Sequence, residues 1–336
     1  MVIACLLVGC GGISRAWLAG IQALPTARLV GLVDLDQDRL QWAREQFAPD
    51  AVCGSDVTQV VGSSGALLVT NSSSPIAHHP TCTAALEAGA HVLCEKPLTE
   101  DLAEAEDLIA IARRCGRHLA VCHNRRVSED ITTVRRLLDT DGLGPVQALR
   151  CDFRRPTGGP DNHRAHLPHV LLWDLGIHHL DQARYLAGAD PVRVYADDWC
   201  PADCRHWRHG PACDALVRFA NGVRCNYRAW YGGLDLPACT TDFQSRWRIS
   251  CEHGVIDWHG TEILVHDAAG SRAVPVPEDG ERGTSAGGRL WLLADMCAAL
   301  QEGRPPAISA SDHIISLRLV SAAIASAESG APQTVV

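Results

Sequence analysis

Residues 2–14 read VIACLLVGCGGIS. The segment opens with an apolar run of strand length, and the glycine-rich turn Gly9–Ser14 follows it at once. A helical pattern then runs over Ser14–Ala23, and a second apolar segment, Leu29–Val33, ends on Asp34. This order predicts the first βαβ unit of a dinucleotide-binding fold, because such a unit joins two parallel strands through a glycine turn and a helix.

The glycine-rich turn is expected to hold the pyrophosphate of the dinucleotide. Gly9 permits the tight turn, and the missing side chain at Gly11 lets phosphates approach free N–H groups at the positive end of a helix. Ser14 stands in place of the third glycine of the fingerprint, and this run alone would also fit a mere tight turn. Asp34 can accept both ribose hydroxyls and would repel a 2′-phosphate, which favours NAD over NADP.

Strands and helices continue to alternate along the first third of the chain, which predicts a parallel sheet covered on both faces. Longer segments of alternating polarity follow, so we expect two domains, residues 1–122 and residues 123–336. The predicted elements are the strands Ala66–Thr70, His91–Cys94, Leu119–Cys122, Val192–Tyr195, Ala215–Phe219, Val223–Trp230 and Trp247–Cys251, the helices Pro80–Glu87, Leu102–Cys115, Arg289–Gln301 and Ser311–Ser326, and a loop over 280–288.

Composition excludes several classes of protein. With 46% apolar and 21% charged residues in a chain of 336, the sequence is that of a globular protein with room for two cores. A net charge of -9 without long basic runs gives no reason to expect nucleic acid or anionic lipid as a partner. The apolar N-terminus lacks a basic start and no apolar run reaches about 18 residues, so we expect no signal peptide, no membrane span and a cytoplasmic protein.

Two further motifs carry chemistry. Asp174 and His178 are four residues apart in a helical pattern and should share one face, where a carboxylate and an imidazole can pass a proton. An ordinary polar pair on a helix surface has the same spacing. The segments Asn71–His78 and Glu95–Pro97 leave the carboxyl ends of predicted strands, where ligands of open α/β sheets bind.

With these motifs in order, the chain resembles the Gfo/Idh/MocA oxidoreductases. The resemblance extends to AALEAGAHV at 84–92, Arg125-Arg126, D-x-G-x-H-x-x-D at 174–181 and FANG at 219–222. It implies an α/β fold with an N-terminal Rossmann domain, a C-terminal α+β domain with a large open, mostly antiparallel sheet, and a site between them. Sheets of this kind often serve oligomerisation in the family, so we expect a homodimer or homotetramer.

The resemblance also implies roles for single residues. Lys96 matches the catalytic lysine of the family, and Asp174 and His178 match its aspartate and histidine. His178 would be the general base, with Asp174 orienting it, while Lys96 would stabilise the developing alkoxide. We expect the cofactor against Gly9, Gly11, Gly12, Ile13, Ser14, Asp34, Asn71, Ser73, His78, Glu95 and Lys96, and the substrate against Asn124, Arg125 and His166.

The expected activity is NAD-dependent hydride transfer to or from a secondary alcohol of a cyclic polyol, sugar or sugar derivative. Two alternatives stay open: glycoside cleavage or epimerisation through transient oxidation, and a non-catalytic dinucleotide-sensing regulator. The glycine-rich turn that often precedes the family's aspartate is absent, which leaves the substrate open. Cys200, Cys204, His206, His209 and Cys213 are potential zinc ligands, but without a C-x2-C pair we expect no metal.

Overall fold

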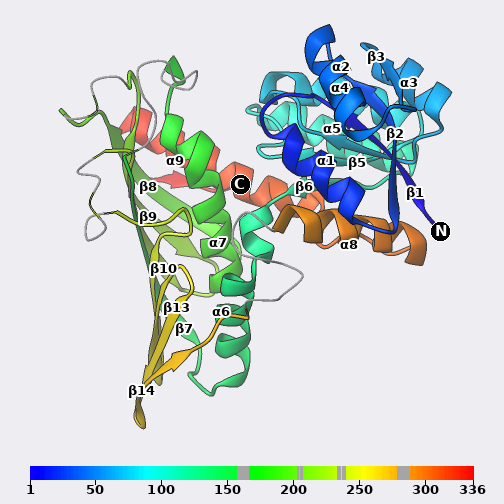
Figure 1. The fold of residues 1–336 in the computed structure, drawn as a ribbon. Helices are drawn as coiled ribbons and strands as arrows, with labels where there is room; N and C mark the ends of the chain where they lie inside the picture. The colour runs from blue at the N-terminus through cyan, green and yellow to red at the C-terminus, as the bar shows by residue number, and fades with distance from the viewer. Residues whose placement is uncertain (157–165, 203, 205–206, 233–235, 237–239, 278–287) are drawn as a thin grey trace. The chain divides into compact units, whose positions relative to one another are not determined.

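The computed structural model describes residues 1–156, 166–202, 204, 207–232, 236, 240–277 and 288–336 (Figure 1). The chain forms two compact units: unit 1 is Met1–Asn124 with Gly287–Ile314, and unit 2 is Arg125–Ala286 with Ile315–Val336. The expected division at residue 122 assigned all later residues to the second domain, whereas Gly287–Ile314 belong to unit 1. The domain ranges 1–122 and 123–336 stay predictions.

Unit 1 contains a six-stranded parallel sheet in the order β3-β2-β1-β4-β5-β6. Its strands are β1 (Ile3–Val8), β2 (Ala27–Val33), β3 (Val52–Gly54), β4 (Leu68–Asn71), β5 (His91–Glu95) and β6 (Leu119–Cys122). The order reverses beside β1, so right-handed connections place helices on both faces of the sheet. The predicted doubly wound fold is confirmed.

The helices of unit 1 form two groups. Along the chain they are α1 (Ser14–Ala23), α2 (Gln37–Phe47), α3 (Val57–Ser64), α4 (Pro75–Glu87), α5 (Leu102–Cys115), α8 (Gly288–Glu302) and the start of α9 (Ala310–Ser329). Helix α1 contacts α2 and α8, whereas α4 contacts α3 and α5. The predicted start of α4 at Pro80 is wrong, because Pro75 occupies its first turn and Pro80 lies inside the helix.

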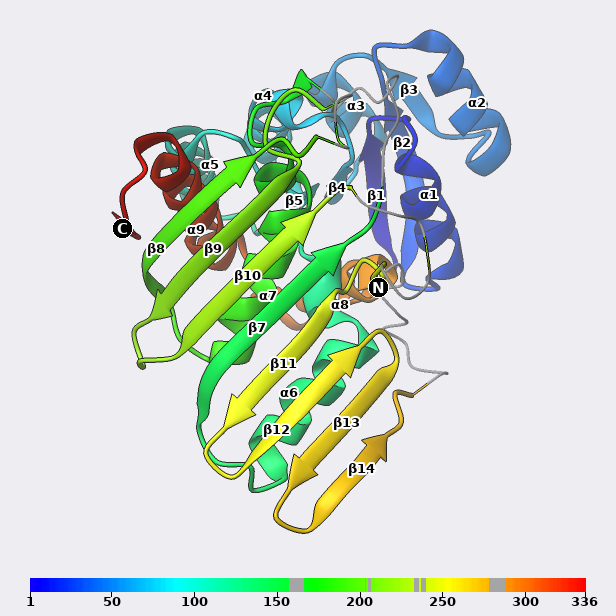
Figure 2. The ribbon, with the colours of Figure 1, turned by 90° about the vertical axis from the view of Figure 1, so that its left-hand side faces the viewer.

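Unit 2 is built on a nine-stranded sheet in the order β14-β13-β12-β11-β7-β10-β9-β8-β15, and among its described strands only the neighbours β7 and β10 run parallel (Figure 2). The strands are β7 (Val146–Arg154), β8 (Pro191–Trp199), β9 (Ala212–Phe219), β10 (Arg224–Trp230), β11 (Arg246–Cys251), β12 (Gly254–His259), β13 (Glu262–Asp267), β14 (Gly270–Val274) and β15 (Gln333–Thr334). The predicted large, mostly antiparallel sheet is confirmed.

One face of this sheet is covered and the other is open. Helices α6 (Glu129–Thr140) and α7 (Ile177–Ala187) lie along the covered face (Figure 1), and the face turned to the viewer in Figure 2 carries no helix among the described residues. In β9, Ala215 and Val217 are buried while Leu216 and Arg218 are exposed, which is the alternation of a half-buried strand. Over the same described ranges, no helix is long and apolar enough to cross a membrane.

Candidate active site

The turn Gly9–Ser14 joins β1 to α1 and has an open side. Gly9 adopts φ 85°, and a Cβ there would lie 2.7 Å from the backbone nitrogen and Cα of Ser73, so only glycine fits. A Cβ on Gly12 would meet nothing within 4 Å, and one on Gly11 would meet only Arg39, at 3.8 Å. A phosphate group can therefore approach the backbone N–H groups at the start of α1, as a bound dinucleotide requires.

Ser14 fills the place of the missing third glycine without opening the turn. Its side chain is fully buried, and its Oγ donates a hydrogen bond to the carbonyl of Gly11 at 2.5 Å. The third glycine normally permits close packing of helix and strand, and a small side chain that bonds back into the turn keeps that packing. Ile13, by contrast, is exposed at the helix start.

Asp34 closes the far side of the turn. Its carboxylate accepts the N–H of Cys10 at 2.5 Å and the N–H of Asp36 at 2.9 Å. Burial, and after it the charge of Asp34, raises the pKa of the Cys10 thiol to about 12, so this thiol stays protonated. Asp34 thus sits at the end of β2 as expected and also holds the glycine turn, which the motif alone did not predict.

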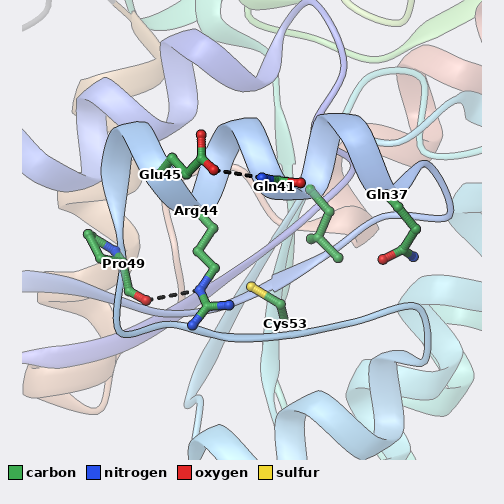
Figure 3. Close-up of a pocket in the computed structure, with 7 residues that line it drawn as sticks. Gln37, Gln41, Arg44, Glu45, Pro49 and Cys53 are labelled. Atoms are coloured by element: carbon green, nitrogen blue, oxygen red, sulfur yellow. Dashed lines mark hydrogen bonds between the residues drawn. The ribbon is translucent and has the colours of Figure 1, made fainter.

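A hollow of about 420 Å³ adjoins the turn. Its walls are Cys10, Gly11, Gly12, Arg15, Asp38, Arg39 and Trp42. The guanidinium of Arg15 lies 4.7 Å from the centre of the Trp42 ring. These α1 and α2 side chains were missed by the sequence analysis, because no motif marks them. A second hollow, between α2 and β3 on the opposite side of the helix, contains none of the turn residues (Figure 3).

The segment after β4 is bonded internally and to the glycine turn. The side-chain carbonyl of Asn71 accepts the backbone N–H of Ser73 at 3.2 Å and its hydroxyl at 2.7 Å. Ser72 Oγ donates to the carbonyl of Gly9 at 2.7 Å. His78 is buried in α4, with Nε2 3.1 Å from the carbonyl of Ser73 and Nδ1 2.9 Å from that of Pro97. The structure therefore brings Gly9, Asn71, Ser73 and His78 together.

Glu95, at the end of β5, is anchored from two helices. Its Oε1 accepts a hydrogen bond from Trp17 Nε1 at 3.1 Å and forms an ion pair with Arg289 Nε at 2.7 Å. Lys96 follows directly and is half-buried. Arg289 could not be found from sequence, since nothing near it in the chain marks a partner for Glu95. Glu95 is thus held in place directly before Lys96.

Two buried histidines support the same turn. His313 Nε2 accepts the N–H of Leu98 at 3.3 Å, which leaves the hydrogen of a neutral ring on Nδ1. That Nδ1 lies 2.5 Å from Nε2 of His123, which follows β6. No sequence pattern marked either histidine.

Lys96 is distinguished by composition as well. Of the 30 Lys and Arg residues in the chain, Lys96 is the only lysine. Arginine does not release its proton at physiological pH, whereas lysine can. Lys96 is therefore the one side-chain amine of the chain, and it directly follows the anchored Glu95 at the end of β5. This signal was available in the sequence and was missed.

In unit 2, Asp174 lies in a π-helical turn, Leu172–Gly176, that leads into α7. Turns of this type occur often at functional sites. The carboxylate of Asp174 accepts a hydrogen bond from the hydroxyl of Tyr231 at 2.9 Å, just past the end of β10. His178 follows in the first turn of α7 and is 4% exposed. A buried imidazole four residues after a carboxylate that is bonded to Tyr231 suits proton transfer better than an exposed polar pair would.

The neighbours of this pair hold α7 in place. His179 is fully buried and bonded to Tyr227, Ser245 and the Phe243 carbonyl, and burial lowers its pKa to about 3. His179 is thus a neutral residue packed inside unit 2. Asp181 accepts hydrogen bonds from Arg126 Nε at 2.7 Å and Ser316 Oγ at 2.6 Å.

The predicted substrate residues differ in their surroundings. Arg125 donates to the Phe243 carbonyl and lies over its ring, and burial lowers the pKa of Arg125 to about 10. Asn124 is buried in unit 1, and its backbone lies against Gly288. A Cβ on Gly288 would lie 2.0 Å from the carbonyl oxygen of Asn124. His166 is exposed. The roles of Asn124, Arg125 and His166 in substrate binding stay predictions.

The cysteine- and histidine-rich stretch 200–213 forms no metal cluster within the described residues. Cys204 is buried and accepts a hydrogen bond from Trp230 Nε1 at 3.3 Å, whereas Cys200 and His209 are exposed. His206 lies outside the described residues. The fourteen cysteines described are free thiols.

Comparison with known proteins identifies the family. The sequence profile of the GFO/IDH/MocA oxidoreductase family, with an NAD-binding Rossmann fold, matches residues 3–123, and the profile of the GFO/IDH/MocA C-terminal domain matches residues 131–257. Myo-inositol 2-dehydrogenase of Thermotoga maritima is 24% identical, with 96% of this chain and 95% of that protein covered. D-apiose dehydrogenase of Paraburkholderia graminis is 31% identical over 56% of this chain and 51% of its own.

Solved structures share the fold over the whole chain. An oxidoreductase of Agrobacterium radiobacter, solved with NAD+, L-tartaric acid and magnesium, has a TM-score of 0.91 at 20% identity and covers 100% of this chain and 99% of its own. An aldose-aldose oxidoreductase of Caulobacter crescentus has a TM-score of 0.84 at 22% identity, with 99% and 100% covered. The chain belongs to the GFO/IDH/MocA family of oxidoreductases, and its first unit is an NAD-binding Rossmann domain.

Proposed function

We propose that this oxidoreductase transfers a hydride between NAD and a secondary alcohol of a cyclic polyol, sugar or sugar derivative. The observation that carries the proposal is the single lysine of the chain, Lys96, at the end of a Rossmann strand beside the anchored Glu95. Relatives that act on polyols and sugars, among them the inositol and apiose dehydrogenases, support this substrate class.

Lys96, Asp174 and His178 each have a distinct role in the proposal. NAD bound at the glycine turn supplies the hydride acceptor for alcohol oxidation. His178 takes the hydroxyl proton, and Asp174 orients the imidazole and stabilises its charged form. Lys96 stabilises the negative charge that develops on the oxygen and, as an ammonium group that can release its proton, joins the proton relay. We further propose that the enzyme is cytoplasmic and contains two or four identical subunits.

Replacement of single residues tests the assignment. We expect Lys96→Ala and His178→Ala each to lower kcat by about 10²-fold or more, with NAD affinity nearly unchanged, because a positioned proton carrier contributes about 10²–10⁴-fold. Lys96→Arg should be nearly as slow, since arginine keeps a charge but does not release its proton. His79→Gln, at a half-buried position on α4 where the ring is paired with Asp107, is the control.

The assay is NADH formation with a panel of inositols, hexoses, amino sugars and glycosides. Near-normal turnover of His178→Ala or Lys96→Ala on the best substrate would refute the proposed relay. Cleavage of a glycoside or inversion of an alcohol without net formation of NADH would show that the enzyme oxidises its substrate only transiently.

A further inference from the structure

A continuous set of contacts runs through unit 1 from the glycine turn to the lysine turn. We define the lysine turn as Glu95–Leu98. The set begins at Gly9, passes through Ser72 and Ser73, crosses the ring of His78 and ends at Pro97. Every member belongs to the same compact unit, so these contacts describe one body.

The first link is steric and leaves little freedom. Any Cβ on Gly9 would lie 2.7 Å from the backbone of Ser73, so the two backbones are already in close contact. Ser72 fastens them further, because its hydroxyl bonds to the carbonyl of Gly9 and its N–H bonds to the carbonyl of Val8 at 2.8 Å. A ligand that fixes the glycine turn must therefore also fix Ser73.

The second link is the ring of His78, which has a carbonyl oxygen at each nitrogen. Burial lowers the pKa of His78, so the ring is neutral and carries one hydrogen. A neutral ring donates either to the Pro97 carbonyl or to the Ser73 carbonyl, and the other nitrogen then faces an oxygen with no hydrogen between them. The position of the hydrogen consequently depends on both carbonyls at once.

The third link holds the residues around Lys96. Pro97 contributes the carbonyl that faces His78, and Leu98 donates its N–H to His313. Glu95 is held by Trp17 and Arg289 on the other side. Lys96 thus stands in a turn whose backbone is fixed on both sides, and a change at the Pro97 carbonyl acts directly on its neighbour.

We propose that His78 is a positioning residue that couples occupancy of the dinucleotide site to the placement of Lys96. The ring transmits the position of the Ser73 carbonyl to the Pro97 carbonyl, so a bound dinucleotide selects one arrangement of the lysine turn. The inference rests on the proposed role of Lys96.

The single lysine makes the test direct. Lys96 carries the only side-chain amine, so its acetylation by an N-hydroxysuccinimide ester can be followed by mass spectrometry, with the N-terminal amine as the reference. ADP-ribose serves as the probe, because it fills the pyrophosphate and adenosine sites but lacks the nicotinamide ring that would shield Lys96. In the unaltered protein, saturating ADP-ribose should change the relative rate by about threefold or more.

Two conservative variants each keep one half of the link. In His78→Asn the side-chain amide can replace Nδ1 and reach Pro97, and in His78→Gln it can replace Nε2 and reach Ser73. Calorimetry with each variant gives the concentration of ADP-ribose that saturates its site, and acetylation is measured at that concentration. In both, the response of Lys96 acetylation to ADP-ribose should disappear. His79→Gln, the neighbouring residue paired with Asp107 at 2.8 Å, should respond like the unaltered protein.

The outcomes separate the two proposals. The coupling would be overturned if ADP-ribose left the acetylation rate of Lys96 unchanged in the unaltered protein. It would also be overturned if ADP-ribose changed that rate in the His78 variants as much as in the unaltered protein. Full activity of Lys96→Ala would overturn the proposed catalytic role instead, and would leave the acetylation result as a purely conformational coupling.

Discussion

At the scale of single residues, Tyr231 determines how Asp174 is presented. Its hydroxyl donates to the carboxylate at 2.9 Å, and its ring is 3% exposed and stacked on Trp207 with the centres 5.2 Å apart. A rigid donor of this kind fixes one carboxylate oxygen and leaves the other for a second partner. Tyr231 therefore orients the residue that we propose orients His178.

Tyr231→Phe should lower kcat while KM changes little. A hydrogen bond to a charged group contributes about 1.5–3 kcal/mol, so the loss of orientation should cost about tenfold in kcat. Steady-state kinetics on the best substrate measure it. Tyr195→Phe, at a 41% exposed position on β8, is the matched control. Equal kcat in the two variants would mean that Asp174 needs no help from Tyr231.

Asp34 should make NAD bind at least about tenfold more tightly than NADP, because its carboxylate faces the extra phosphate as a like charge. The hydrogen bonds to Cys10 and Asp36 show which variant to use. Asp34→Asn removes the charge and keeps one of the two acceptor oxygens, so it should narrow the NAD/NADP affinity ratio while it gives up the hydrogen bond from either Cys10 or Asp36. Fluorescence titration with both cofactors gives the ratio, and equal affinities in the unaltered protein would remove Asp34 from the ribose site.

His179 should make stability depend on pH. Its pKa is lowered to about 3 in the folded protein, against about 6.5 when unfolded, so only the unfolded chain takes up a proton between these values. Its contribution is complete above about pH 6.5 and is lost as the pH falls toward 3, with about 2 kcal/mol gone at pH 5.

The measurement compares urea unfolding at pH 7.5 and pH 5. The fall in the free energy of unfolding should be about 2 kcal/mol smaller in His179→Gln than in the unaltered protein, because the other histidines contribute equally to both. An identical pH dependence would show that the ring does not enter the unfolding equilibrium as a neutral group.

At the scale of elements, α7 is held by one buried ion pair. Arg126 has little exposed side chain (10%) and Asp181 almost none (1%), and Ser316 from α9 adds a third contact. Arg126→Ala should lower the free energy of unfolding by about 3–5 kcal/mol, since it leaves a buried carboxylate without its counter-charge. Arg114→Ala, which removes an exposed pair with Glu87 in unit 1, should cost about 1 kcal/mol or less.

Chemical denaturation of both variants provides the comparison. If Arg126→Ala loses no more free energy of unfolding than Arg114→Ala, water reaches Asp181 and the pair is not buried in solution.

Sequence patterns predicted the elements with strong local signals. The glycine turn and β1 follow from apolar runs and glycine chemistry, and they appear within a residue or two of the prediction. The π-helical turn at Asp174 was not predicted, because an extra residue in a helical turn leaves the spacing of apolar residues nearly unchanged. Helix α2 was missed because its face is mostly polar, with only Leu40 and Ala43 buried.

Contacts between residues far apart in the chain could not be predicted from the sequence. Glu95 and Lys96 were recognised as a motif, but the bond from Arg289 joins residues far apart in sequence and leaves no local pattern. The same holds for Tyr231 and Asp174. Sequence therefore predicted which residues carry the proposed chemistry, and the structure supplied the residues that hold them.

At the scale of the whole molecule, the open face of the nine-stranded sheet should determine assembly. Leu216 is 57% exposed on this face and Leu264 is 43% exposed, and ion pairs such as Arg228 with Asp214 accompany them. An uncovered sheet face of this size with exposed large apolar residues is typical of a surface that another subunit covers. We therefore expect a dimer or tetramer formed through this sheet.

Leu216→Glu should shift the protein toward smaller species, because it places an unpaired charge in the middle of the contact. Sedimentation velocity at several protein concentrations measures the change. Leu35→Glu, at an 84% exposed position after β2 in unit 1, adds the same charge elsewhere and should leave the assembly intact. A monomer in the unaltered protein, or an unchanged oligomer in Leu216→Glu, would mean that this face stays open to water and that the exposed leucines have another role.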